Sequence, residues 1–521
     1  MGAQSYISVQ PLGGSVDFAG TFGELRNHHF HSGVDFRTGG RIGEPVRAVA
    51  NGYLSRIVVR PDGFGWALYL SHPSGFTSVY AHLDDFQPAW HDVAMNLAAR
   101  SQSHKLDLYL EPGAYAVQAG DTIGWSGNSG GSAGPHLHFE WRDARSEEPL
   151  DPFDYGLFYG TDSFSPRLIA LYNAQGQRVS ISDGVWNEVI SVAAWPDLGL
   201  EYLDRKHPKG LSLGMQSLET EWNSFEDSSR IFHQMWEMKR FSFEDTRSAD
   251  GLMQPEVKRL TGKRTYRVAP ALTKSPRWSG ATPDYLKPGK YLLRLTATAA
   301  NGEVIKSEGP VLLTSHDSPW KGGDSVIFGS NGTLGTEHME LTWAKNSFTE
   351  AFTPRFVEVD ATHWRGSPDV PVLQSLEYSW IPPKDYPDAW RSKTVLIGRD
   401  ARGSYRIIGD PQSNGRIRFR IKIFGDLRIT QDLEAPKLGS ITTSSFQGKA
   451  AWSLRMVDNL LDIVDYSVWI NQVWHWSYYD AKNKRLYIPK PQISGMMSGT
   501  NMQIRAKDEA GNLSTFDVTL P

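Results

Sequence analysis

The chain has 521 residues, a formal net charge of −4 and no cysteine. This length is too great for one hydrophobic core and suggests three or four domains. The lack of cysteine excludes disulfides, thiolate metal ligands and cysteine nucleophiles, and the near-neutral charge without a basic stripe gives no indication of nucleic-acid binding.

Aromatic residues and glycine are plentiful, with 18 Trp, 20 Tyr, 23 Phe and 49 Gly. This composition favours β-rich domains with many turns over coiled coil or disorder. No apolar run approaches about 18 residues, so we expect no transmembrane segment. The first ten residues, MGAQSYISVQ, lack the pattern of a signal peptide. We therefore expect either a cytoplasmic protein or one whose signal peptide has been removed.

The first part of the chain, to about residue 160, is predicted to consist of short strands and glycine-rich turns. Residues 66–83 predict a hairpin with its turn at Pro73-Ser74-Gly75. Residues 86–107 contain alanine and leucine but no glycine, and they predict a helical excursion. Residues 120–143 return to short strands around a loop of glycine and serine.

Strand patterns dominate the rest of the chain. The segments 289–302, 415–426 and 500–512 each alternate apolar and polar residues with period two, which is typical of half-buried strands. Residues 228–241 suggest a helix inside a long insertion. We expect a mostly β protein with an antiparallel β domain followed by immunoglobulin-like β-sandwich modules. The expected boundaries are 1–160, with a helical insertion at about 84–119; 161–317, with an insertion at about 200–285; 318–432; and 433–521.

The stretch HHFHSGVDF, residues 28–36, holds three histidines and one aspartate within a few positions. His31 and Asp35 are four residues apart, and a straight strand would separate their Cα atoms by about 13 Å. The chain must therefore bend if both side chains are to reach one ion, and Gly33 at the midpoint permits a bend.

A second group of histidines lies in GPHLHFE, residues 134–140. Period two in a strand places His136 and His138 on the same face. Without cysteine, a zinc site must use histidine nitrogens and carboxylate oxygens. A catalytic site needs three such ligands, an open position and an adjacent proton-transfer group. His82, in VYAHL, is a further candidate at the end of a strand pattern.

The three motifs HFHSGVDF, VYAHL and GPHLHFE, in this order, resemble the M23 family of zinc metallopeptidases, the lysostaphin- or LytM-type peptidases. The resemblance covers residues 18–155, approximately. It implies one Zn²⁺ ion held by His31, Asp35 and His138, with His82 and His136 as catalytic histidines, while His28 and His29 lie outside the spacing. It also implies a peptidoglycan peptide as substrate, either a cross-link or a stem peptide, and a periplasmic or secreted location.

The implied mechanism is hydrolysis by a metal-activated water. Zinc lowers the pKa of water from about 15.7 toward about 7 and polarises the scissile carbonyl. The two catalytic histidines would orient the water, stabilise the developing charge and pass a proton to the leaving amine.

Three other functions stay open. The domain could be a non-catalytic scaffold that binds cell wall and activates another hydrolase, with an envelope protein as partner. It could be a zinc D,D-carboxypeptidase, although those typically have a longer spacing between His and Asp. The chain could also be an array of adhesion or glycan-binding modules. The aromatic cluster 468–480 would suit glycan binding, but alternating Trp and Tyr favour core packing.

Overall fold

The computed structural model describes most of the chain. The described residues are 6–14, 17–26, 29–173, 175–192, 198–228, 231–245, 248–253, 255–268, 277–280, 288–314, 330–345, 347–348, 352, 354–367, 370, 372–400, 403–490 and 501–519. The structure is mostly β, as the sequence predicts. Among the described residues, no helix has the length and hydropathy needed to cross a lipid bilayer.

The N-terminal domain is built on one antiparallel sheet. Its strands are β1 (Phe18–Gly20), β4 (Val34–Arg37), β6 (Gly52–Val59), β7 (Trp66–Ser71), β8 (Phe76–Ala81), β10 (Leu106–Tyr109), β11 (Ala116–Val117), β13 (His136–Asp143) and β14 (Pro149–Leu150). They are ordered β1-β4-β13-β8-β7-β6-β10, with β11 on β6 and β14 on β13. The predicted hairpin of residues 66–83 is confirmed, since β7 and β8 pair with Ser71 opposite Thr77.

Smaller elements complete this domain. A second sheet contains β5 (Pro45–Arg47), β12 (Thr122–Ser126) and β9 (Leu83–Phe86), in that order. A short hairpin joins β2 (Leu25–Arg26) to β3 (His29–Phe30), and a 3-10 turn, η1, covers Pro152–Tyr155. The helix α1 covers Pro88–Ser101 and ends at Gln102, which has a positive φ of 48°. The helix is thus shorter than the predicted excursion at 86–107. From Leu106 onward the chain forms the strand β10, which pairs with β6 and buries Leu106.

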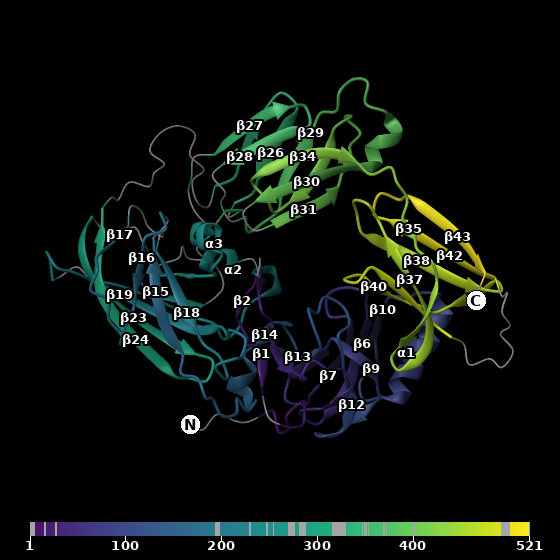
Figure 1. Ribbon diagram of the computed structural model, residues 1–521, viewed down its shortest axis with the longest axis horizontal. Coiled ribbons are helices and arrows are strands. Elements are labelled where there is room, and N and C mark those ends of the chain that lie inside the picture. Colours follow the sequence, from purple (N-terminus) through teal and green to yellow (C-terminus); the bar gives the residue numbers. More distant parts are fainter. Residues whose placement is uncertain are drawn as a thin grey trace.

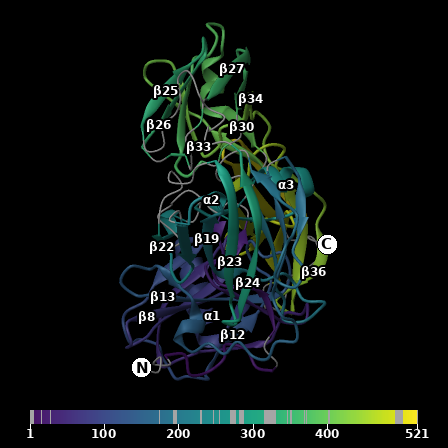
Figure 2. The same ribbon diagram turned by 90° about the vertical axis from the view of Figure 1, so that its left-hand side faces the viewer.

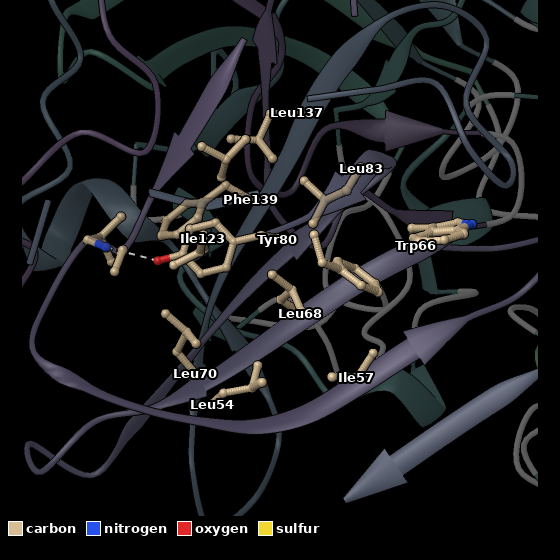
Figure 3. Close-up of a cluster of buried hydrophobic side chains, with 14 of the residues drawn as sticks. Leu54, Ile57, Trp66, Leu68, Leu70, Tyr80, Leu83, Ile123, Leu137 and Phe139 are labelled. Carbon is tan, nitrogen blue, oxygen red and sulfur yellow. Dashed lines mark hydrogen bonds between the residues drawn. The ribbon is translucent and has the colours of Figure 1, made fainter. Parts of the chain in front are cut away.

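The core of the N-terminal domain lies under β6, β7, β8 and β13 (Figure 3). Leu54, Leu68, Tyr80 and Phe139 each have no exposed surface. Burying a side chain of this size stabilises the fold by about 1.5–3 kcal/mol relative to leaving it exposed. The Tyr80 hydroxyl also accepts a hydrogen bond of 2.9 Å from the backbone N–H of Val49, so its polar end is satisfied in the core. This core makes β8 and β13 a rigid support for what lies at their ends.

We call the next group of strands module 2. It has two sheets that share one core. The first is ordered β16 (Arg178–Ser180), β15 (Arg167–Tyr172), β18 (Gly199–Leu203), β21 (Tyr266–Arg267), and the second β17 (Ile190–Val192), β24 (Val304–Leu313), β23 (Gly289–Ala299), β19 (Met215–Ser224), β20 (Ile231–Glu237), β22 (Arg277–Gly280). Its helical turns are η2 (Phe243–Asp245), α2 (Ser248–Leu252) and α3 (Pro255–Thr261).

The helix suggested for residues 228–241 is wrong. In the described part of this segment the chain forms the strand β20, which pairs with β19. Phe232, Gln234 and Trp236 alternate as buried positions with period two, and this spacing suits a strand whose one face covers the core. Much of the supposed insertion at 200–285 therefore contributes strands to the two sheets of module 2.

Module 3 and module 4 are also pairs of sheets around one core each. Module 3 contains β25 (Gly332–Gly335), β26 (Met339–Trp343), β27 (Arg355–Asp360), β28 (His363–Ser367), β29 (Leu376–Trp380), η4 (Asp388–Lys393), β30 (Thr394–Asp400), β31 (Gly403–Ile408), β32 (Asp410–Pro411), β33 (Ile417–Ile421) and β34 (Asp426–Gln431). Module 4 contains β35 (Lys437–Leu438), β36 (Thr442–Phe446), β37 (Lys449–Val457), β38 (Ile463–Ile470), β39 (Val473–His475), β40 (Tyr478–Asp480), β41 (Arg485–Pro489), β42 (Asn501–Asp508) and β43 (Leu513–Thr519).

The three predicted period-two strands are confirmed as β23, β33 and β42. Two-sheet packing is the architecture that the sequence predicts for modules 2 to 4, whereas their immunoglobulin-like character and the boundaries at 160, 317 and 432 stay predictions.

The four parts follow one another around a curve, and module 4 returns to the N-terminal domain (Figure 1). Module 3 lies at the end of the molecule opposite the N-terminal sheet (Figure 2). Trp474, Trp476 and Tyr478 pack against the N-terminal core, whereas Val468 and Ile470 belong to the core of module 4. The aromatic cluster 468–480 is thus used for packing, partly inside its module and partly between module 4 and the N-terminal domain.

Candidate active site

The two histidine motifs meet where β4 pairs with β13. His138 lies directly opposite Asp35 in this pairing, and Ala81, the residue before His82, is opposite His138 on the other side. His31 Nε2 is 3.0 Å from Asp35 Oδ1 and 3.1 Å from His138 Nδ1. His138 Nδ1 is 2.8 Å from the same Asp35 oxygen. Two imidazole nitrogens and one carboxylate oxygen therefore form a tight triangle.

Gly33 is needed here mainly because the chain comes close to a neighbouring strand. The chain bends at Gly33, just before β4. A Cβ atom at this position would lie 2.2 Å from the Phe139 carbonyl oxygen and 2.9 Å from Glu140 Cγ. Glycine is thus required by the contact with β13, in addition to the bend that the sequence predicts.

Hydrogen bonds set which ring nitrogen of each histidine faces the triangle. His31 Nδ1–H donates to the Thr21 carbonyl at 2.8 Å, and His138 Nε2–H donates to Glu140 Oε1 at 2.9 Å. His31 Nε2 and His138 Nδ1 are therefore the ring atoms that face Asp35. Such outer partners fix the tautomer of metal-ligating histidines. The donor set and its orientation fit a divalent cation that accepts nitrogen and oxygen ligands, such as zinc.

The buried charges around the triangle are balanced against each other. Burial lowers the pKa of His31 to about 4. Burial also disfavours the charged form of His138, but Asp35 and Glu140 outweigh it and raise the pKa to about 9. For Asp35, burial is outweighed by the three neighbouring histidines, which hold its pKa well below the usual range. The carboxylate is therefore charged at neutral pH and attracts a cation.

Glu140, a residue that the sequence analysis did not single out, supports His138. Glu140 has no exposed surface and accepts hydrogen bonds from Ser32 and from Arg142, at 2.6 Å from Nε of the arginine. Burial raises the pKa of Glu140, but Arg142 and His138 outweigh it and lower the pKa overall. Glu140 lies two residues after His138 on the same face of β13, so period two could have identified it.

Arg26 is a second supporting residue, and it holds the other oxygen of Asp35. Its Nη2 is 2.7 Å from Asp35 Oδ2, which leaves Oδ1 for the triangle. The charge of Arg26 adds to the field that keeps Asp35 ionised. No spacing rule links Arg26 to the site, because it comes from the strand β2 of a separate hairpin.

His82 and His136 flank the triangle. Their ring centroids are 4.8 Å apart, and His136 Nε2 is 3.4 Å from Asp35 Oδ1. His82 Nδ1–H donates to the Ser129 carbonyl at 2.9 Å, and His136 Nδ1–H donates to the Gly134 carbonyl at 2.8 Å. Both rings are thus held by Nδ1, which leaves Nε2 available for proton transfer.

The backbone at His82 supports this placement. Its φ of 59° lies in the left-handed region, which costs a residue other than glycine about 1–3 kcal/mol and is common at functional sites. Burial, followed by the nearby His138 and His136, lowers the pKa of His82 to about 3. The ring is therefore neutral at physiological pH.

A groove of about 900 Å³ surrounds these residues. Its walls come from the segments around His31, Phe64 and His82, from the glycine- and serine-rich loop 131–135, and from Leu211, Ser212 and Arg264 of module 2. All five predicted site residues line it, together with the exposed His29. His28 lies outside the described residues. The contribution of module 2 could not be predicted from local patterns.

Comparisons with known proteins point to the same region. The model of "Peptidase family M23" matches residues 29–93. The DD-carboxypeptidase/endopeptidase Mpg of Neisseria meningitidis serogroup B is 30% identical over 133 residues, which are 26% of this chain and 24% of the relative. The glycyl-glycine endopeptidase ALE-1 of Staphylococcus capitis is 30% identical over 141 residues, 26% of this chain and 32% of the relative.

Each of these matches covers only part of the chain and part of the relative. The chain spans about a quarter of the length of the first of these relatives. Among solved structures, the catalytic domain of lysostaphin from Staphylococcus simulans shows 27% identity and covers 26% of this chain and 87% of that one, with a TM-score of 0.20. From the family match and these relatives, the N-terminal part of this chain is a domain of peptidase family M23.

Proposed function

We propose that the N-terminal domain is a zinc metalloendopeptidase that hydrolyses peptide cross-links or stem peptides of bacterial peptidoglycan. The convergence of His31 Nε2, Asp35 Oδ1 and His138 Nδ1 within 3.1 Å is the observation that carries this proposal. The substrate class is supported by relatives whose names describe endopeptidase activity, among them a glycyl-glycine endopeptidase.

His31, Asp35 and His138 would hold the zinc ion in this proposal. A zinc ion bound there supplies a Lewis acid for the scissile carbonyl and lowers the pKa of water toward about 7. Glu140 and Arg26 act through these ligands. Glu140 holds His138 in the required tautomer, and Arg26 occupies the second oxygen of Asp35.

We assign His82 and His136 to the proton transfers. Because both rings are anchored through Nδ1, their Nε2 atoms keep a fixed direction beside the ligand triangle. They would orient the attacking water, stabilise the negative charge that develops on the carbonyl oxygen, and pass a proton to the leaving amine. Burial keeps the ring of His82 neutral before the reaction, so its Nε2 can accept a proton from the attacking water.

The groove suits an extended peptide chain. Its loop 131–135, GSAGP, has little side-chain bulk, so a substrate backbone can approach closely. A substrate in the cell wall implies that the protein works outside the cytoplasm, in the periplasm or as a secreted protein. Module 2 borders the groove through Leu211 and Arg264 and would contribute to the choice of substrate.

The test measures bound zinc and reaction products separately. Zinc content is measured by mass spectrometry of the purified full chain, and peptidoglycan digests are analysed for new peptide ends. His31→Ala is expected to lose both zinc and activity. His136→Ala is expected to keep zinc while the rate falls about 10²–10⁴-fold. His233→Ala, at a half-buried histidine of β20, is the matched control and should change neither.

The outcomes distinguish the alternatives. Product profiles that are the same for wild type and His136→Ala would eliminate the enzymatic role. Bound zinc without hydrolysis of any wall preparation would favour a non-catalytic scaffold that activates another hydrolase. Release of only the terminal residue from a stem peptide would indicate a carboxypeptidase.

A further inference from the structure

Three aspartates converge where module 3 is joined to module 4. Asp432 follows β34, Asp458 follows β37, and Asp508 is the last residue of β42. They come from three separate segments, yet one carboxylate oxygen of each lies within 4.8 Å of the others. Like charges at this distance repel each other strongly in a buried environment, so the arrangement needs an explanation.

Asp432 is the buried member whose charge is not balanced. It has no exposed surface, and neither of its carboxylate oxygens has a hydrogen-bond partner of normal geometry among the described residues. The backbone N–H of Glu434 favours its charged form without reaching that geometry. Burial, followed by Asp458 and Asp508, raises the pKa of Asp432 to about 6. A buried carboxylate without a partner is costly.

The other two aspartates are held in place on their outer sides. Asp458 Oδ1 accepts hydrogen bonds from the N–H groups of Leu460 and Leu461, each at 3.0 Å, while its Oδ2 is buried without a partner. The two oxygens of Asp508 accept from the backbone N–H and the side-chain amide of Asn512, at 2.8 and 2.9 Å. The loops are thus ordered by their own hydrogen bonds, and the free lone pairs remain inside the cluster.

A lysine near the cluster is engaged elsewhere. Lys393 donates a hydrogen bond to the side-chain oxygen of Asn512. The side-chain amide of Asn512 also donates to the Asp432 carbonyl at 3.0 Å. The charged side chains with the strongest effect on the pKa of Asp432 are acidic, namely Asp458, Asp508 and Glu434. Lys437 acts on Asp458, but its ammonium forms its ion pair with Glu434, at 2.6 Å. Among the described residues, none of the three aspartates is within ion-pair distance of a cation.

We propose that Asp432, Asp458 and Asp508 bind one calcium ion at the junction of modules 3 and 4. The donors are oxygens only, which hard cations prefer, and Ca²⁺ tolerates irregular sets of carboxylate ligands. A spacing of up to 4.8 Å between oxygens equals two Ca–O bonds of about 2.4 Å. Mg²⁺ requires shorter bonds of about 2.0–2.1 Å in a near-octahedral arrangement.

The position of the site gives the ion a structural role. Asp432 belongs to the connection between the two modules, and the other two ligands belong to module 4. Beside the cluster, Val395 of β30 packs against Leu461 and Ala510 of module 4 in a small apolar contact. Bound calcium would join the connection to both loops and hold module 4 in a fixed orientation relative to module 3.

The test is a calorimetric titration of the full chain, freed of metal ions, with CaCl₂ and separately with MgCl₂. Wild type is expected to bind one Ca²⁺, and Asp432→Asn and Asp458→Asn to bind it at least about 10-fold more weakly. Asp458→Asn keeps the oxygen that accepts hydrogen bonds from Leu460 and Leu461, so this variant should fold and can test the site even if Asp432→Asn does not fold. Asp465→Asn, an exposed aspartate of β38, is the matched control and should bind as wild type does.

Thermal unfolding gives a second and independent reading. Without calcium, Asp432→Asn should be at least as stable as wild type, because the unpaired buried charge is gone. With Ca²⁺ at about 100 times its Kd, the ratio of folded to unfolded wild type should rise about 100-fold, while Asp432→Asn gains little. The proposal is overturned if wild type shows no heat of binding and no stabilisation at several millimolar Ca²⁺, or if Asp432→Asn and Asp458→Asn respond as Asp465→Asn does.

Discussion

The substitution Glu140→Gln separates the structural role of Glu140 from its proposed role in metal binding. The carboxylate is completely buried and pairs with Arg142, which is itself 5% exposed. Glutamine leaves the guanidinium with Glu147 as its remaining ion-pair partner, at 3.5 Å, and 52% of that side chain is exposed. Breaking a buried pair from one side costs about 3–5 kcal/mol. Weakening the hydrogen bond to His138 should also lower zinc affinity about 10–100-fold.

A second substitution distinguishes the two effects. Arg142 Cζ lies 5.5 Å from the ring centre of Tyr69 and 4.7 Å from that of Phe243. Methionine can fill such a site between aromatic rings, so Arg142→Met in the Glu140→Gln background should recover most of the lost stability by removing the unpaired charge. It cannot restore the carboxylate behind His138, and zinc affinity should stay low.

Stability is measured by urea unfolding of the zinc-free proteins, followed by tryptophan fluorescence, and zinc affinity by competition with a chelating dye. A loss of stability below about 1 kcal/mol in Glu140→Gln would contradict the reasoning about the buried pair. Full recovery of zinc affinity in the double variant would show that Glu140 does not act on His138 through its hydrogen bond.

Three further predictions concern the packing around the site. Gly33→Ala should lower stability by about 1–3 kcal/mol and should also lower zinc affinity. The added Cβ would lie 2.2 Å from the Phe139 carbonyl oxygen and push β4 away from β13. Thermal unfolding measures the first effect and zinc titration the second. Burial and the nearby Asp154 raise the pKa of Asp151 from 3.8 to about 7. The stability that this group contributes is therefore complete below pH 3.8 and is lost as pH rises through about 7. Asp151→Asn should exceed wild type above pH 7 by up to about 4 kcal/mol, and the difference should shrink toward pH 4 in urea unfolding. Tyr478→Phe removes the acceptor of the Gly130 N–H, now at 3.2 Å, which should cost about 1–3 kcal/mol and slow peptide hydrolysis.

Each of these predictions has a result that would contradict it, and two have a matched control variant. Gly335→Ala, where a Cβ would meet nothing within 4 Å, should leave stability and zinc binding unchanged, and equal effects at both glycines would contradict the steric argument. A pH-independent difference between Asp151→Asn and wild type would mean that the carboxyl does not titrate in the folded protein near pH 7. Tyr487→Phe, on the neighbouring strand β41, is the matched control for the tyrosine, and an equal loss of rate in both would refute a specific effect on the loop.

The location of the candidate site could be predicted because its residues lie in short motifs with local geometric consequences. Period two in residues 134–140 predicts that His136 and His138 share a face, and the structure has both beside Asp35. Arg26 could not be predicted, because its contact with Asp35 depends on how a separate hairpin packs. The groove residues of module 2, such as Arg264, depend in the same way on contacts between distant parts of the chain.

The fold was predictable where one face of a strand is buried and uncertain where helix and strand patterns overlap. The segments of β23, β33 and β42 alternate cleanly, and each forms the predicted strand. The segment 228–241 has charged and apolar residues that fit a helix almost as well. The segment forms a strand because it pairs with the neighbouring strand β19, which leaves Phe232 and Trp236 on the buried face.

The N-terminal domain and module 2 each bury apolar side chains that belong to the other. Phe22, Leu25 and Phe30 are buried in the core of module 2, and Leu213 of module 2 is buried in the N-terminal core. A fragment cut out at residue 160 would present three of these side chains to water and leave a hole where the fourth had been. The N-terminal domain therefore depends on module 2 for its packing. Transferring it to another protein would require replacing its exposed apolar side chains or including module 2.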